Sequence, residues 1–167
     1  RDYYASRGLG DVYKRQDFCR VVLELLDKTE FPVRHLCLEI TERCRSLPVS
    51  VINERMAVLR GYGIKFAMDD FGTGSSSSAM ALEMLIDEIK IDMSFIRKIL
   101  VNKKNKAIVQ SMVDFANAAN IKSCLEGVEN KALEDYLRTV GATWFQGYYY
   151  SKPVGADELE ILLSAKK

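Results

Sequence analysis

Short apolar runs alternate with segments of helical apolar spacing along almost the whole chain, and this alternation limits the folds available to it. The strand-like runs cover residues 35–42, 64–72, 88–95, 121–129 and 143–151. The helical segments cover residues 18–26, 49–63, 96–120, 131–141 and 156–165. Strands separated by helices in this way are typical of βα units and a parallel sheet. Because crossovers in such units are right-handed, the pattern predicts either an open doubly wound sheet or a barrel.

The composition favours one globular domain and argues against a polyanionic partner. The chain has 167 residues, of which 48% are hydrophobic, so it holds enough apolar material for a core. Its 24 Lys and Arg residues balance 23 Asp and Glu residues, for a formal net charge of +1. Such a weak overall field predicts no nucleic-acid polymer or anionic membrane as partner, so an anionic ligand would need a local site.

The cysteines and the absence of long apolar runs predict a cytoplasmic location. None of Cys19, Cys37, Cys44 and Cys124 has CxxC spacing, and with one histidine in the chain no structural zinc site is expected. Three of the four lie in apolar runs and are expected to be buried thiols of a reducing compartment. No run approaches ~18 apolar residues and the first residues are polar, so we expect neither a membrane segment nor a signal peptide.

Residues 1–16 do not share the pattern of the rest of the chain. They show no helical or strand periodicity, and their aromatic and basic residues follow no face. They resemble translated sequencing-adapter read-through, so we expect a non-native arm here; a genuine flexible arm is the alternative. The domain is therefore expected to span residues 17–167, and a chain that starts with Arg1 is expected to be a fragment.

Polar residues stand at or near the ends of the apolar runs. They are Glu39, Asp69 with Asp70, Lys90, Glu126 and Gln146. Because parallel strands end at the same edge, these side chains are expected to share one rim, where catalytic residues of βα barrels come from. Clustered carboxylates repel one another unless a cation lies among them, and hard oxygen ligands suit Mg²⁺ or Mn²⁺. The rim therefore predicts a divalent metal site.

Two alternatives to this interpretation stay open at this point. Charged residues often flank strands simply because strands end at solvent, and Lys90, between Ile89 and Ile91, could point outward into water. The single histidine, His35, begins its run and is expected at the opposite rim, which argues against a Ser-His-Asp or Cys-His mechanism.

Five short motifs in this order resemble the successive signatures of the EAL family of cyclic-di-GMP phosphodiesterases. They are Glu39-Ile-Thr-Glu42, Asp69-Asp70-Phe-Gly-Thr-Gly74, Lys90-Ile-Asp92, Glu126-Gly-Val-Glu129 and Gln146-Gly-Tyr148 followed by Ser151-Lys-Pro153. The resemblance covers the chain from Asp17 to its end. It implies a modified (β/α)₈ TIM-like barrel that hydrolyses cyclic di-GMP to linear pGpG with Mg²⁺ or Mn²⁺.

The resemblance also implies a role for each site residue. Glu39 and Asp69 would bind a first metal ion, and Asp69 with Asp70 would engage a second. Lys90 would orient or activate the attacking water, Glu126 would bind or position metal and water, and Gln146 would contact the water network. Glu129 would brace the loop after Asp70, which in this family lies near a homodimer interface.

The chain departs from the family pattern at its N-terminal side. The family's Glu-Ala-Leu motif and a metal-binding asparagine do not appear between Asp17 and Glu39. A full (β/α)₈ domain needs roughly 250 residues. We therefore expect a truncated EAL domain, an incomplete barrel of about five βα units, that is itself inactive. The alternatives are a degenerate EAL module that acts as a cyclic-di-GMP receptor or protein-interaction domain, and an unrelated open α/β domain.

Overall fold

The computed structural model describes residues 17–41, 47–74 and 77–164, and the expected arm over residues 1–16 lies outside them. In the described part, five strands form one sheet: β1 (Cys37–Thr41), β2 (Lys65–Phe71), β3 (Glu88–Ile91), β4 (Lys122–Glu126) and β5 (Trp144–Gln146). The order in the sheet is β1-β2-β3-β4-β5, and every neighbouring pair is parallel. The predicted βα units are confirmed.

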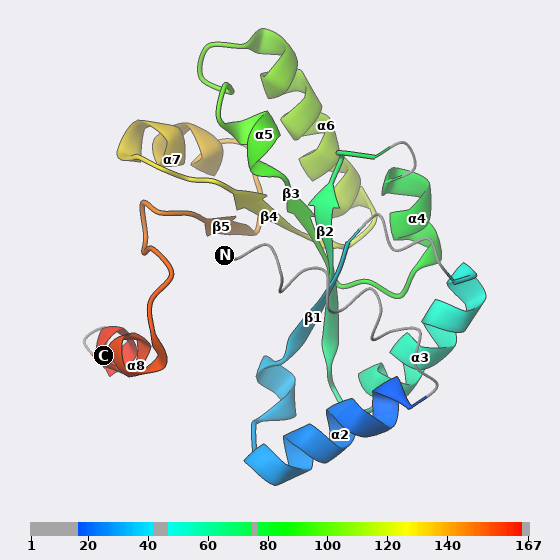
Figure 1. Ribbon diagram of the computed structural model, residues 1–167. Coiled ribbons are helices and arrows are strands. Elements are labelled where there is room, and N and C mark those ends of the chain that lie inside the picture. The colour runs from blue at the N-terminus through cyan, green and yellow to red at the C-terminus, as the bar shows by residue number, and fades with distance from the viewer. Residues whose placement is uncertain (1–16, 42–46, 75–76, 165–167) are drawn as a thin grey trace.

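The strand order decides between the two predicted architectures. Strands that follow one another in sequence also neighbour one another in the sheet, without the reversal of a doubly wound fold. Right-handed crossovers then carry every connecting helix to the same side of the sheet. Figure 1 shows the helices after β1 to β4 along one side, and no described helix covers the other side. The fold is part of a βα barrel.

The helices connect and cover the strands. They are α2 (Phe18–Thr29), the short 3₁₀ helix η2 (Val33–His35), α3 (Val49–Gly61), α4 (Ser77–Glu83), α5 (Met93–Ile96), α6 (Lys103–Ala118), α7 (Lys131–Arg138) and α8 (Ala156–Ser164). The prediction of one long helix over 96–120 is wrong. The Asn102 side chain accepts hydrogen bonds from the backbone N–H groups of Lys104 (2.9 Å) and Asn105 (3.4 Å). This cap begins α6 afresh, because it satisfies N–H groups that a helix start leaves without partners.

The core lies between the sheet and its helices. Successive side chains of a strand point to opposite faces, so every second residue faces the helices. On that face the fully buried side chains include Phe66, Met68, Ile89, Ile91 and Leu125, and the helices contribute Ile52, Met56, Leu59, Val109 and Val113. The remaining positions of each strand face the open side, and most of them are polar. This second face is called the inner face below.

The two edges of the sheet have one described neighbour each. β1 pairs with β2 and β5 pairs with β4, so the described strands do not close into a ring. β5 has three residues, shorter than the predicted strand over 143–151. α8 has no buried residue and stands apart from the sheet in Figure 1. An open sheet of five strands agrees with the predicted incomplete barrel.

Two further expectations concern thiols and membranes. Of the described cysteines, Cys124 is buried, Cys19 is partly buried and Cys37 is exposed, and Cys44 lies outside the described residues. The expected burial is therefore wrong for Cys37, because this residue is the first of the edge strand β1 and its side chain lies on the inner face. No described helix is both long and apolar enough to cross a lipid bilayer.

Candidate functional site

The site is built around the ammonium group of Lys90 on β3. Its Nζ lies 2.9 Å from Glu39 Oε1 on β1, 3.3 Å from Asp69 Oδ1 on β2 and 2.9 Å from Glu126 Oε1 on β4. Four adjacent strands thus contribute one charged side chain each. Lys90 is only 7% exposed, so the alternative in which it points outward into water is wrong.

Register and alternation explain why residues so far apart in sequence meet. Thr41 on β1 pairs with Asp69, Lys90 pairs with Cys124, and Glu126 pairs with Gln146 on β5. All of these positions face the inner side, near the carboxyl ends of their strands. Parallel strands bring such ends to one rim. The structure therefore brings Glu39, Asp69, Lys90 and Glu126 together as expected, while their chemical roles stay predictions.

Asp70 departs from regular strand geometry. The register between β2 and β3 shifts between Met68 and Phe71, and Asp70 has φ of 56°. A left-handed conformation is uncommon for a residue with a side chain and is found at turns and functional sites. Gly72 follows with φ of 95°. The Asp69-Asp70 pair thus lies at an irregularity near the end of β2, two residues before Gly72.

The charges of the cluster support one another. Burial on its own would lower the pKa of Lys90, but hydrogen bonds to Glu39 and Glu126 raise it above the ordinary lysine value. The ammonium group therefore stays charged. Burial raises the pKa of Glu126, and Lys90 opposes that shift. One ammonium faces three carboxylates, so the ionised cluster keeps an excess of negative charge that favours a further cation.

The donors suit a divalent ion, although they are not arranged around one. Within residues 17–41, 47–74 and 77–164, no group of three or more His, Cys, Asp or Glu side chains has a geometry that would hold a metal. The oxygens of Glu39, Asp69 and Glu126 converge on the Lys90 ammonium, which takes the position of a cation among them. Carboxylate oxygens are the ligands that Mg²⁺ and Mn²⁺ prefer. The residues present therefore fit such an ion.

Gln146 and Glu129 lie beside the cluster rather than in it. Both line a cavity of about 280 Å³ together with Glu126, Met93, Arg97, Gly127, Gly147 and Tyr148. Gln146 is exposed on β5, and its backbone carbonyl accepts a hydrogen bond from Val128 N (3.0 Å). Glu129 Oε1 lies 4.0 Å from Arg97 Nε, and both side chains are about half exposed. The predicted bracing of the loop after Asp70 stays a prediction, because that loop includes residues 75–76, outside the described part.

Sequence reasoning missed one neighbour of the site. Arg97 follows α5 and borders both Glu126 and Glu129 in the same cavity. An arginine just after a short helix carries no periodic signal, so nothing in the sequence distinguishes it from a surface residue. Only the packing of α5 beside β4 brings it to the rim.

The chain is similar to known proteins along most of its length. The family model of the EAL domain matches residues 10–153. Cyclic di-GMP phosphodiesterase PdeB of Shewanella oneidensis is 36% identical over 124 residues, which is 74% of this chain and 14% of that protein. Cyclic di-GMP phosphodiesterase PdeA of Borreliella burgdorferi is 34% identical over 140 residues, 84% of this chain and 21% of that protein.

Solved structures agree with the sequence relatives. The EAL enzyme Bd1971, in its form with cAMP and cyclic di-GMP bound, superposes with a TM-score of 0.86 at 34% identity, covering 92% of this chain and 41% of that chain. The chain spans between 14% and 26% of the length of the first five curated relatives it matches.

Proposed function

The chain belongs to the EAL domain family, and from this premise we propose that its inner rim is part of a divalent-metal-dependent active site that hydrolyses cyclic di-GMP to linear pGpG. The observation that carries the proposal is the ion-pair cluster of Lys90 with Glu39, Asp69 and Glu126. Relatives that share 34–36% of their aligned residues with it are cyclic di-GMP phosphodiesterases.

Four carboxylates would hold the metal ions. Glu39 and Asp69 would bind one ion, Asp69 and Asp70 would engage a second, and Glu126 would complete the set from β4. When bound, two such ions lower the pKa of a water molecule and neutralise the charge that grows on the phosphoryl oxygens. The excess negative charge of the cluster and its hard oxygen donors support this assignment.

Lys90 and Gln146 would position the reacting groups. Lys90 has a fixed, charged ammonium, so it would orient the attacking water or a phosphate oxygen while its carboxylate partners accept hydrogen bonds from it. Gln146, at the rim on β5, would contact the water network. Glu129 would brace the loop after Asp70. A covalent nucleophile is unnecessary, and His35 lies at the opposite ends of the strands.

The test measures the formation of pGpG by chromatography. The reaction is run with Mg²⁺ or Mn²⁺ and again with a chelator. The protein to assay is a longer form that includes the sequence upstream of this chain. Lys90→Ala and Asp69→Asn should each abolish turnover, and Asp69→Asn should also weaken metal binding. Lys104→Ala, which removes an exposed lysine of α6, is the matched control and should leave turnover unchanged.

We propose that the chain alone turns over little. Its open sheet contributes only part of the oxygen ligands that an octahedral ion needs, and a loosely held ion does not fix the nucleophile. Robust metal-dependent turnover by the chain alone would show that the ligands are misassigned. Binding of cyclic di-GMP without cleavage by the longer form would favour the receptor function instead.

The remaining proposals concern the complete protein. We propose that it forms a homodimer through the region after Asp70 and works in the cytoplasm. Sedimentation of the longer form, with and without cyclic di-GMP, checks the first, and fractionation of the host cell checks the second.

A further inference from the structure

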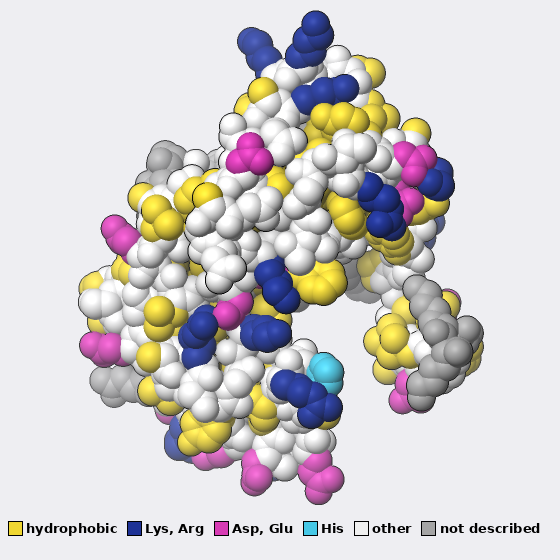
Figure 2. Space-filling model, turned by 180° about the vertical axis from the view of Figure 1, so that it is seen from behind, with side chains coloured by type: hydrophobic (Ala, Val, Ile, Leu, Met, Phe, Trp, Pro, Cys, Tyr) yellow, Lys and Arg dark blue, Asp and Glu magenta, His cyan; other side chains and the backbone are white. Residues whose placement is uncertain are grey.

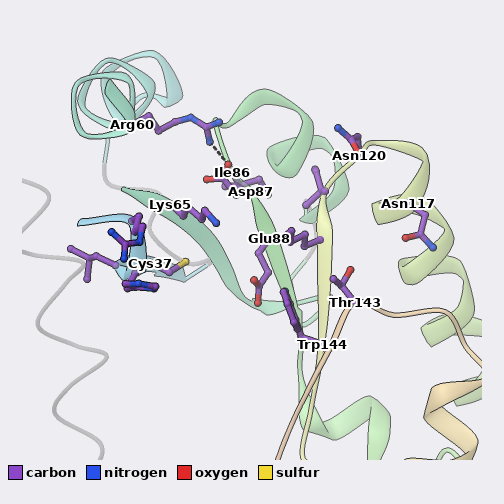
Figure 3. Close-up of a pocket in the computed structure, with 15 residues that line it drawn as sticks. Cys37, Arg60, Lys65, Ile86, Asp87, Glu88, Asn117, Asn120, Thr143 and Trp144 are labelled. Atoms are coloured by element: carbon purple, nitrogen blue, oxygen red, sulfur yellow. Dashed lines mark ion pairs between the residues drawn. The ribbon is translucent and has the colours of Figure 1, made fainter. Parts of the chain in front are cut away.

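A pocket lies on the inner face at the amino ends of the strands (Figure 3). The five described strands form only part of a barrel, and in a complete barrel side chains fill the interior, so this pocket does not define a ligand site. A contact that is already buried among described residues does not depend on further strands. Glu134 on α7, which is 6% exposed, makes such a contact.

Glu134 accepts three hydrogen bonds on a single carboxylate oxygen. Its Oε1 lies 3.0 Å from Arg138 Nε, 2.6 Å from Arg138 Nη2 and 3.3 Å from the hydroxyl oxygen of Tyr150. Figure 2 shows acidic and basic side chains close together over α7, on the right of that view. A glutamate is almost never buried so deeply unless it is paired, and here Arg138 pairs with it from the next turn of the helix.

Tyr150 connects this pair to the segment that follows β5. Burial, and then the nearby Glu134 carboxylate, raise the pKa of Tyr150 above its ordinary value, so the phenol stays protonated and donates the hydrogen bond. Of the two adjacent tyrosines, Tyr150 and not Tyr149 makes this bond among the described residues. The contact joins two elements of the fold, whereas the contact of Glu134 with Arg138 stays within α7.

The same segment is bound to the loop after β4 through its backbone. The Gln146 carbonyl accepts a hydrogen bond from Val128 N–H (3.0 Å), and Tyr149 N–H donates one to the Val128 carbonyl (2.9 Å). Gly147 lies so close to the Val128 backbone that a Cβ at this position would clash with it. The register pairs Gln146 with Glu126, so these contacts fix where Gln146 lies relative to the proposed metal ligands.

The side chains of α7 hold the segment at two points. Arg138 Cζ lies 5.6 Å from the centre of the Phe145 ring, directly before Gln146 in the chain. Glu134 binds Tyr150, shortly after Gln146. The Glu134–Arg138 pair therefore contacts both flanks of Gln146 and restricts the segment that carries it.

We propose that Glu134 is a positioning residue, which fixes the segment carrying Gln146 at the rim by binding Arg138 and Tyr150. This inference rests on the proposed phosphodiesterase function, in which Gln146 contacts the water network. Glu134 touches no reacting group and acts only through the segment. A misplacement of about 1 Å can cost roughly a hundredfold in rate. Loss of one contact out of several should cost less.

Hydrogen exchange of the backbone, followed by mass spectrometry, measures how firmly residues 145–151 are held. The protein is the longer form that includes the sequence upstream of this chain. Tyr150→Phe removes only the hydroxyl, so exchange in this segment should become about tenfold faster, as for loss of a hydrogen bond to a charged group. Exchange in α6 should stay unchanged. Tyr149→Phe is the matched control and should exchange as the parent protein does.

Turnover of cyclic di-GMP shows whether the segment acts on the reaction. Glu134→Ala and Tyr150→Phe should each lower kcat about tenfold and change KM less than about twofold, because Gln146 would contact water rather than substrate. Glu134→Gln keeps an oxygen that accepts from Tyr150, so it should retain more of kcat than Glu134→Ala. Tyr150→Phe added to Glu134→Ala should cause no further loss, because both changes remove the same bond.

Three results would overturn the proposal. They are equal exchange in Tyr150→Phe and Tyr149→Phe, losses of kcat that add in the double variant, and faster exchange in α6 as well, which would assign Glu134 to overall stability alone. A parent protein that binds cyclic di-GMP without cleaving it would refute the proposed phosphodiesterase function instead. Exchange of residues 145–151 would still decide whether Glu134 holds the segment.

Discussion

Replacing Lys90 with methionine keeps an unbranched side chain of similar size and removes its charge. The carboxylates of Glu39, Asp69 and Glu126 would then face one another without the ammonium that now lies 2.9–3.3 Å from each. Removing one partner of a buried ion pair costs about 3–5 kcal/mol. The Glu39 side chain is 47% exposed and can rehydrate, so we expect the lower end, about 3 kcal/mol.

Thermal unfolding followed by circular dichroism measures this loss. A domain of this size loses about 2–4 °C of Tm per kcal/mol, which predicts a decrease of about 6–12 °C. The matched control is Lys65→Met, a lysine of the same face without an ion pair to a described residue, which should shift Tm by less than about 2 °C. A Lys90→Met variant no less stable than this control would refute the reasoning that the ammonium neutralises the cluster.

Acid and divalent ions should both restore part of the stability that Lys90→Met loses. Burial already raises the pKa of Glu126, and loss of the ammonium would raise it further, above its value in the unfolded chain. A carboxyl whose pKa is raised by folding destabilises the folded state above that pKa. The difference in stability between the parent chain and Lys90→Met should therefore become smaller from pH 8 toward pH 5. Mg²⁺ should add about 2.7 kcal/mol at a hundred times its Kd. At the same Mg²⁺ concentration the parent chain, where Lys90 occupies the centre, should bind the ion more weakly and gain less.

Two further predictions concern close packing and the thiol of Cys37. A Cβ on Gly147 would clash with the backbone oxygen of Val128, whereas one on Gly155 would meet nothing within 4 Å. Gly147→Ala should therefore lower the free energy of unfolding by about 1–3 kcal/mol in chemical denaturation and Gly155→Ala almost not at all; equal losses would contradict the packing. Desolvation and the nearby carboxylates, Glu88 first, raise the pKa of Cys37 to about 11, although the residue is exposed. Alkylation of this thiol at pH 8, followed by mass spectrometry, should therefore be about 100-fold slower than in the denatured chain, and equal rates would contradict the raised pKa.

Several features of this protein follow from the sequence alone. Apolar runs of period two between helical segments predict parallel strands, and Glu39, Asp69, Lys90 and Glu126 each stand near the end of such a run. Chain direction is the same in every parallel strand, so position along the run is enough to place these residues at one rim. The family resemblance rests on the same residues, because the motifs are the strand ends themselves.

Other features depended on contacts between elements. Hydrophobic periodicity does not reveal that Asn102 caps a new helix, because the apolar pattern runs on across residues 96–120. The exposure of Cys37 depends on β1 being an edge strand. The pairing of Glu129 with Arg97 depends on where α5 packs.

The clearest division concerns the two faces of the sheet. Alternation shows that Lys65, Glu88, Lys122 and Trp144 share a face with their neighbours two residues away, but not which face is covered. The right-handed crossovers decide that, because they place the helices on the other side and leave these side chains on the inner face. Sequence order therefore determined which residues end a strand, and strand register with helix placement decided which of them meet.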